Sequence, residues 1–208
     1  MAHSTEGLRL DHDMGDRLTR GGGGWQLVDT PQDLWAWADV FTPEECDSII
    51  EVGRSATLCR ATTTGSEDDP RRDSSVAFLY PDEMTGWIFR KLAGAIVATN
   101  AFFGFDLTQM MEGIQFTEYR APGQNYGWHV DAGPSVSIRK LSLVVQLTDP
   151  DEYEGGELEL NPHGDGLIMG KVRGRAYAFP SWTLHRVKPM VTGTRHSLVV
   201  WVTGPAFR

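Results

Sequence analysis

Apolar residues recur at helical spacing in two segments of the first half of the chain. Residues 42–45 read Thr-Pro-Glu-Glu, the composition of a capping box with proline in the first turn, and apolar positions then follow at three- and four-residue intervals to Gly53. A second segment with this period predicts a helix from about Asp82 to Phe103, and Gly104 is placed to end it. The first half of the chain therefore predicts two helices.

Beyond Gly104 the apolar runs become short and are separated by glycine, proline, asparagine and aspartate. Strands are predicted near residues 111–119, 127–131, 140–147, 157–160, 166–169, 175–179, 184–188 and 195–202. Short strands at this spacing are typical of a sandwich or barrel. The pattern predicts a mostly β fold with flanking helices, in which the two earlier helices pack on the outside of the strands.

Two further segments have the composition of exposed chain. Residues 1–24 are rich in charge and glycine and predict a flexible N-terminal tail, which leaves residues 25–208 as a single domain. Residues 61–75 are polar throughout and predict an exposed loop.

Composition narrows the class of protein. The two cysteines, Cys46 and Cys59, are too few for a disulfide framework or zinc cluster and suit a reducing compartment. The chain shows no signal peptide and no apolar run near the ~18 residues of a membrane span, so we expect a cytoplasmic protein with no membrane partner. The formal net charge of −9 argues against a nucleic acid partner, whose phosphates it would repel.

Metal-ligating residue types occur at strand spacing in His129-Val130-Asp131. Residues i and i+2 of a strand point to the same face, so the imidazole and the carboxylate would converge. His185, which enters a later predicted strand, is the best candidate for a third ligand. Two histidines and one carboxylate form a facial triad that leaves coordination positions open, an arrangement suited to iron(II).

The same letters recur in His163-Gly164-Asp165. This copy lies in a glycine- and proline-containing turn, where no strand would direct both side chains inward. It also lies close to His185 in the sequence, whereas Asp131 is far enough away for the two segments to form opposite walls of a barrel. These differences favour His129-Val130-Asp131 as the metal-binding tripeptide.

The last predicted strand adds a buried cation. Arg195, Ser197, Val199 and Trp201 alternate and should share one face. An arginine that points into a core is costly unless it meets an anion, and a carboxylate is its natural bidentate partner. A protein carboxylate at the barrel rim is the alternative partner.

Taken together, these residues resemble the prolyl-4-hydroxylase-like branch of the 2-oxoglutarate/Fe(II)-dependent oxygenases, especially its bacterial and phage members. The similarity runs from about Phe41 to Val202 and includes the segments 114–119, 126–131, 139–142 and 153–158.

The resemblance implies a double-stranded β-helix (jelly-roll, cupin-like) core with the N-terminal helices packed on one sheet. It implies that His129, Asp131 and His185 bind Fe(II), and that Arg195 takes the distal carboxylate of 2-oxoglutarate. The other residues implied on the cosubstrate side are Ser197, Tyr119, Gln146 and Trp201. Gln146 departs from the family pattern, because some relatives carry a tyrosine there.

The implied activity is hydroxylation of an unactivated C–H bond with 2-oxoglutarate and O2 as cosubstrates, giving succinate and CO2; ascorbate is a candidate reductant. Halogenating relatives replace the metal-binding carboxylate with a small residue, so Asp131 favours hydroxylation. Desaturation and cyclisation by the same oxidant stay open.

The substrate is the least determined feature. The short acidic chain favours a hydroxylase of a small molecule or amino acid. The alternative is a peptidyl or protein prolyl hydroxylase, in which the 61–75 loop closes over a peptide. The third hypothesis is a non-catalytic jelly-roll metal binder or sensor. The oligomeric state stays open. Candidate substrate-pocket residues are Gln115, Thr117, Arg139 and Trp182.

Overall fold

The computed structural model describes residues 25–27, 35–61, 71–110, 112–133 and 136–206. The predicted tail at residues 1–24 and most of the predicted 61–75 loop lie outside these residues. Within them, the chain forms two α-helices and two antiparallel sheets, as the mostly β prediction required. Neither described helix combines the length and hydropathy needed to cross a lipid bilayer.

Both helices occur where the apolar period places them. Helix α2 (Pro43–Ser55) starts with the predicted capping box, in which the Thr42 hydroxyl accepts from the Glu45 amide and the Glu45 carboxylate accepts from the Thr42 amide. Helix α3 (Gly86–Phe103) ends at Gly104, whose φ of 64° suits glycine. It starts four residues later than predicted, because Asp82 accepts backbone hydrogen bonds from residues 84 and 85 and forms a turn there.

The larger sheet has the strand order β1-β2-β12-β8-β14-β6-β5-β3, and β9 pairs with one end of β14. In that order the strands are Trp25–Leu27, Ala36–Asp39, Arg175–Pro180, Arg139–Gln146, Met190–Thr203, Ile114–Arg120, Ser75–Leu79 and Cys59–Arg60, with β9 at Tyr153–Gly155 after the short 3-10 helix η3 (Pro150–Glu152).

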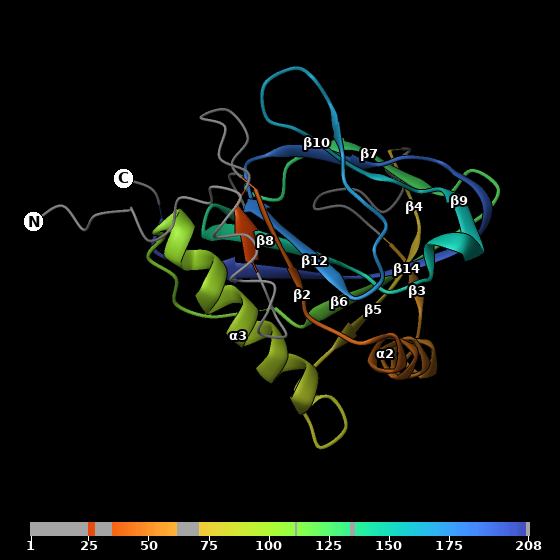
Figure 1. Cartoon of the computed structure of the whole chain (residues 1–208), viewed down its shortest axis with the longest axis horizontal. Coiled ribbons are helices and arrows are strands. Elements are labelled where there is room, and N and C mark those ends of the chain that lie inside the picture. Colours follow the sequence, from red (N-terminus) through yellow and green to blue (C-terminus); the bar gives the residue numbers. More distant parts are fainter. Residues whose placement is uncertain (1–24, 28–34, 62–70, 111, 134–135, 207–208) are drawn as a thin grey trace, which may run out of the picture.

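The smaller sheet has the order β11-β10-β13-β7-β4 and faces the larger one (Figure 1). Its strands, in that order, are Leu167–Ile168, Leu158–Asn161, Leu184–Val187, Asn125–His129 and Arg72–Asp73. Strands β1 to β5 and β9 were not among the predicted ones. In particular, β4 and the start of β5 lie in the segment predicted as a loop, because strands this short carry too few alternating positions to be recognised.

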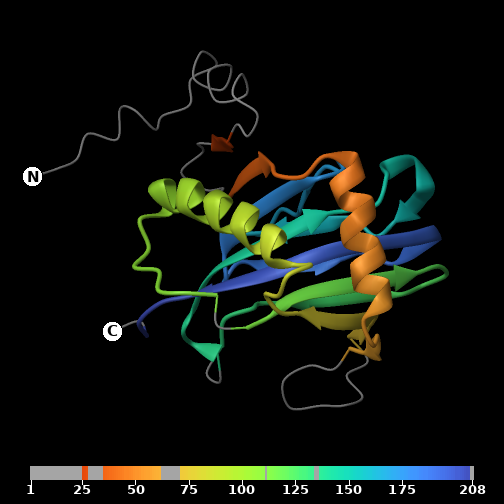
Figure 2. The ribbon, with the colours of Figure 1, turned by 90° about the horizontal axis from the view of Figure 1, so that it is seen from below.

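Both helices pack on the outer face of the larger sheet (Figure 2), which confirms the predicted placement of the helices. One apolar cluster joins Ile49 of α2 and Leu92 of α3 to Phe116, Leu143 and Leu198 of the sheet. The inner face of the larger sheet and the facing smaller sheet together form the walls of a cavity.

Close packing of α2 on the sheet gives a first testable prediction. Gly53 lies directly on the ring of Phe116, and an added Cβ would overlap that ring. We expect Gly53→Ala to lower the free energy of unfolding by about 1–3 kcal/mol in urea denaturation, because overpacking outweighs the better helix propensity of alanine.

Gly94 provides a matched control, since it lies in the interior of α3 and an added Cβ there meets no atom within 4 Å. Gly94→Ala should raise the free energy of unfolding by roughly 0.5–1 kcal/mol. If both substitutions stabilised the protein, the contact of Gly53 with Phe116 would not determine how α2 packs.

Candidate metal and cosubstrate site

His129 and Asp131 point to the same side of the chain although only one of them is in a strand. His129 is the last residue of β7 and Asp131 lies two residues beyond its end, so the prediction that both lie on a strand is wrong for Asp131. The alternation continues because the Asp131 amide donates to the Ser181 carbonyl at 2.9 Å. Val130, between them, is 45% exposed.

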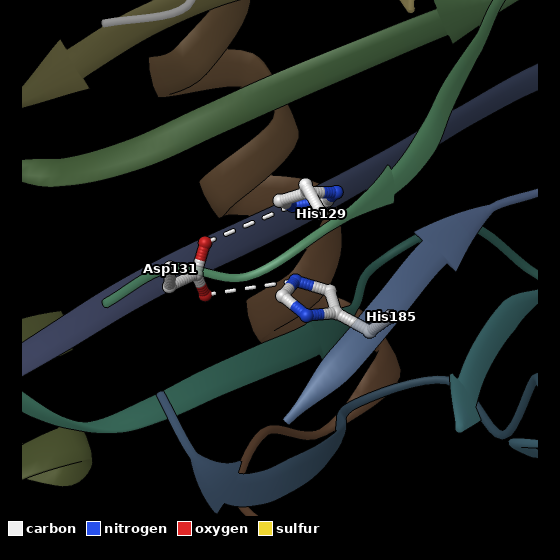
Figure 3. Close-up of side chains that lie close together, drawn as sticks. All are labelled: His129, Asp131 and His185. Carbon is white, nitrogen blue, oxygen red and sulfur yellow. Dashed lines mark ion pairs between the residues drawn. The ribbon is translucent and has the colours of Figure 1, made fainter. Parts of the chain in front are cut away.

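His185 reaches the same point from the neighbouring strand β13, where it pairs directly with His129. The ligand atoms of His129, Asp131 and His185 all lie within 4.8 Å of one another (Figure 3). His129 Nε2 is 3.7 Å from Asp131 Oδ1, and His185 Nε2 is 3.6 Å from Asp131 Oδ2.

Backbone carbonyls fix the tautomer of both imidazoles. His129 Nδ1 lies 2.8 Å from the Gly127 carbonyl oxygen, and His185 Nδ1 lies 2.9 Å from that of Thr183. A carbonyl oxygen only accepts, so each Nδ1 carries a proton and each Nε2 faces Asp131.

Protonation states agree with this arrangement. Burial, with the adjacent His185, lowers the pKa of His129 to about 3, so its imidazole is neutral at neutral pH. Burial raises the pKa of the Asp131 carboxyl, but His185, His129 and the Ser142 hydroxyl lower it by more, so the carboxyl is ionised.

With both rings in the neutral form, the cluster directs two imidazole lone pairs at a carboxylate. Such groups repel one another unless a cation lies between them. Two neutral imidazoles and one carboxylate are a donor set that suits a divalent first-row metal, iron(II) among them. The residues present fit the metal.

A cavity of about 590 Å³ opens over this cluster, with walls from both sheets. The buried side chain of Arg195 lines it from β14 and is 1% exposed. Its Nε and Nη2 donate to Gln146 Oε1 at 3.2 and 2.9 Å, and its Nη1 lies 3.4 Å from Ser197 Oγ. The guanidinium also lies 5.5 Å from the centre of the Tyr119 ring.

Known proteins match both the sequence and the fold. The 2OG-Fe(II) oxygenase superfamily matches residues 114–203. A PKHD-type hydroxylase of Colwellia psychrerythraea is 27% identical over 78% of this chain and 74% of its own length, and one of Prochlorococcus marinus is 33% identical over 52% of this chain and 49% of its own.

Solved structures extend the match to the whole fold. A prolyl-4-hydroxylase of Pseudomonas putida is similar with a TM-score of 0.67, at 20% identity, over 93% of this chain and 98% of its own. A prolyl hydroxylase of Trichoplax adhaerens, solved with a peptide fragment of hypoxia inducible factor, has a TM-score of 0.67 at 16% identity, over 96% and 91%.

In sequence and fold the chain is similar to the prolyl-4-hydroxylase-like 2-oxoglutarate/Fe(II) oxygenases. Its fold is the double-stranded β-helix that the resemblance implied, and the cofactors of the family are Fe(II), 2-oxoglutarate and O2.

Most of the residues that the sequence singled out meet in this cavity. Strand parity on β14 places Arg195, Ser197, Val199 and Trp201 on the cavity side, while His196, Leu198 and Val200 face the helices. The candidate residues that line the cavity are His129, Asp131, His185, Arg195, Ser197, Tyr119, Trp201, Gln115 and Arg139.

Three candidate residues do not line the cavity. Gln146 contacts Arg195 from behind, and the Thr117 hydroxyl accepts a hydrogen bond from Gln115 at 2.9 Å. Trp182 lies in the turn after β12, where its ring packs edge-on against Phe105 at 5.4 Å and does not line this cavity. The second tripeptide, 163–165, is an exposed turn between β10 and β11.

Several residues around the site were not among the candidates for metal, cosubstrate or substrate binding. Ser142 Oγ donates to Asp131 Oδ2 at 2.7 Å, and Glu112 accepts two hydrogen bonds from Arg139. Tyr126 stacks on His129 with ring centres 3.5 Å apart, and Arg72 lies 4.5 Å above its ring. Two of them carried a signal: Ser142 shares strand β8 with Gln146 at even spacing, and Tyr126 is an aromatic residue near His129 in the sequence and a candidate for the apolar wall.

Proposed function

We propose that the oxygenase hydroxylates an unactivated C–H bond of a small molecule or amino acid, coupled to conversion of 2-oxoglutarate to succinate and CO2. The observation that carries this proposal is one cavity with two kinds of site in its walls. One is a cluster of lone pairs for a metal, and the other is a buried guanidinium for an anion.

His129, Asp131 and His185 would hold Fe(II). The Gly127 and Thr183 carbonyls keep both imidazoles in the tautomer that offers Nε2, and the Ser142 hydroxyl holds the carboxylate. When bound, Fe(II) supplies the redox chemistry that activates O2 with 2-oxoglutarate as electron donor.

Arg195 would bind the distal carboxylate of 2-oxoglutarate. Among the described residues its hydrogen-bond partners, Gln146 and Ser197, are neutral, and no carboxylate forms an ion pair with it. A buried guanidinium with neutral partners favours an anionic ligand, because the ligand offsets the cost of its desolvation. Gln146 would orient the guanidinium from behind, and Ser197 would add a hydroxyl on the cavity side.

The apolar walls would keep water from the reacting carbon. Val144, Leu158, Val187 and Val199 line the cavity from both sheets. They offer no hydrogen bonds to solvent, so a bound substrate would displace water rather than share the site with it.

An ion pair at the cavity wall supports a small polar substrate. Arg139 and Glu112 are bonded to each other and both line the cavity, so a guanidinium and a carboxylate lie side by side there. An amino acid carries the complementary pair of groups.

A rim of apolar side chains supports the second candidate, a peptidyl prolyl hydroxylase. Phe78, Val130 and Leu184 line the cavity yet are 42%, 45% and 38% exposed. Such a rim would bind a substrate that extends beyond the cavity. The solved Trichoplax adhaerens relative holds a peptide.

A substrate screen separates these candidates. Purified protein with Fe(II), 2-oxoglutarate and O2 is incubated with free amino acids in one set and proline-containing peptides in another, and succinate and a mass gain of one oxygen atom are measured together. We expect both signals with a member of the amino-acid set. Both signals only with peptides would favour the second candidate. No succinate and no 2-oxoglutarate binding would favour a non-catalytic metal binder.

A further inference from the structure

The indole N–H of Trp201 is buried without a hydrogen-bond acceptor in the described part of the chain. Trp201 lies on β14, lines the cavity and is 8% exposed. Among the described residues, its Nε1 is the buried side-chain nitrogen or oxygen atom that has no hydrogen-bond partner. A buried donor without an acceptor costs about 1–3 kcal/mol, so its retention in the cavity needs an explanation.

The indole lies beside the carboxylate of the proposed metal site. Trp201 pairs directly with Ser142 across β14 and β8, and Ser142 donates to Asp131 Oδ2 at 2.7 Å. Paired residues project on the same face of a sheet, so the indole and the hydroxyl approach Asp131 from one side. The indole N–H itself completes no hydrogen bond to the carboxylate.

Arg139 fixes the ring in this position. Its guanidinium carbon lies 3.9 Å from the centre of the Trp201 ring, and Nη1 donates to the Asp131 carbonyl at 3.2 Å. Nε and Nη2 of Arg139 are bonded to Glu112. One arginine therefore covers the indole, holds the backbone of Asp131 and is itself held in place, which leaves the ring little freedom to turn.

We propose that Trp201 is a positioning residue whose indole N–H, together with the Ser142 hydroxyl, fixes the orientation of the Asp131 carboxylate as a metal ligand. When a metal is bound, the indole N–H would add a second hydrogen bond to that of Ser142, and two donors on one carboxylate would restrain its rotation. A carboxylate that cannot rotate binds through one oxygen and leaves coordination positions open for cosubstrate and O2. The inference rests on the proposed metal site at His129, Asp131 and His185.

Binding of Co(II) alone to metal-free protein tests this role without turnover. We expect Trp201→Phe to weaken Co(II) binding about tenfold and to change the visible absorption of the bound ion, since loss of an outer partner of a ligand has roughly this effect. Trp182→Phe is the matched control, because that indole packs on Phe105 outside the cavity. It should leave affinity and spectrum unchanged.

A second variant separates the N–H from the shape of the ring. Substitution of Trp201 by 3-benzothienylalanine keeps the bicyclic shape and replaces the N–H by sulfur, and we expect it to weaken Co(II) binding as Trp201→Phe does. Wild-type affinity and spectrum in the benzothienyl variant would overturn the inference and leave the metal site in place. Failure of the wild-type protein to bind Co(II) would overturn the metal site, and the inference with it.

Discussion

Substitution of His185 by alanine is expected to reduce Fe(II)-dependent formation of succinate from 2-oxoglutarate by more than a hundredfold. His185 supplies one of the two imidazole lone pairs that face Asp131. Loss of an outer partner of a ligand typically costs 10–100-fold, so loss of a ligand itself should cost more. Succinate release, measured with and without added Fe(II), checks the result. Far-UV circular dichroism checks that the variant is folded.

His163→Ala is the control for this substitution, because His163 belongs to the tripeptide with the same letters but lies in an exposed turn. It should retain wild-type turnover. Loss of turnover in His163→Ala with normal activity in His185→Ala would mean that the metal is bound by the second tripeptide and that the cluster in Figure 3 is structural.

The helix positions could be read from the sequence because they depend on local chemistry. The capping box of Thr42 and Glu45 is complete within four residues, and Gly104 ends α3 through its own backbone conformation. The start of α3 was misplaced for an equally local reason: the Asp82 carboxylate accepts backbone hydrogen bonds from residues 84 and 85 and stabilises a turn before the helix.

Strand parity and chain separation favoured the first of the two His-x-Asp tripeptides. The expectation that its segment and that of His185 form opposite walls of a barrel is wrong, because β7 and β13 are neighbouring strands of the smaller sheet. The structure brings His129 and His185 opposite each other on paired strands, while residues 163–165 form a turn. The sequence did not reveal that β7 ends at His129, because the backbone contact that keeps Asp131 inward comes from Ser181, far along the chain.

The contacts that refine the site required the register of the sheets. Ser142 and Trp201 become neighbours only through the pairing of β8 with β14, and Glu112 meets Arg139 only when β6 and β8 are placed in one sheet. A period of two assigns a residue to a face, but it does not say which residue of another strand lies opposite. Residue type and closeness in sequence were also insufficient to place Trp182. This aromatic residue lies near His185 in the sequence but packs outside the cavity.

Arg195 is expected to determine the affinity for 2-oxoglutarate. We expect Arg195→Gln to raise the dissociation constant for 2-oxoglutarate, measured anaerobically with bound Mn(II), by more than about 30-fold. Loss of one partner of a buried, hydrogen-bonded charge pair costs roughly 2–5 kcal/mol, which corresponds to this factor at its lower end. Metal affinity should stay unchanged, because Arg195 contacts none of the three proposed ligands by a hydrogen bond.

The stability of the same variant distinguishes a cosubstrate clamp from a structural arginine. Arg195 is 1% exposed and its hydrogen-bond partners are neutral, so its removal leaves no buried carboxylate unpaired among the described residues. We therefore expect Arg195→Gln, without 2-oxoglutarate, to unfold at the same urea concentration as the wild type or a higher one, since the cost of burying a lone guanidinium disappears. Arg175→Gln is the control for 2-oxoglutarate binding, because Arg175 forms an ion pair with Asp39 away from the cavity. It should leave 2-oxoglutarate binding intact. Strong destabilisation of Arg195→Gln with unchanged 2-oxoglutarate affinity would mean that the guanidinium stabilises the barrel and that the cosubstrate carboxylate binds elsewhere.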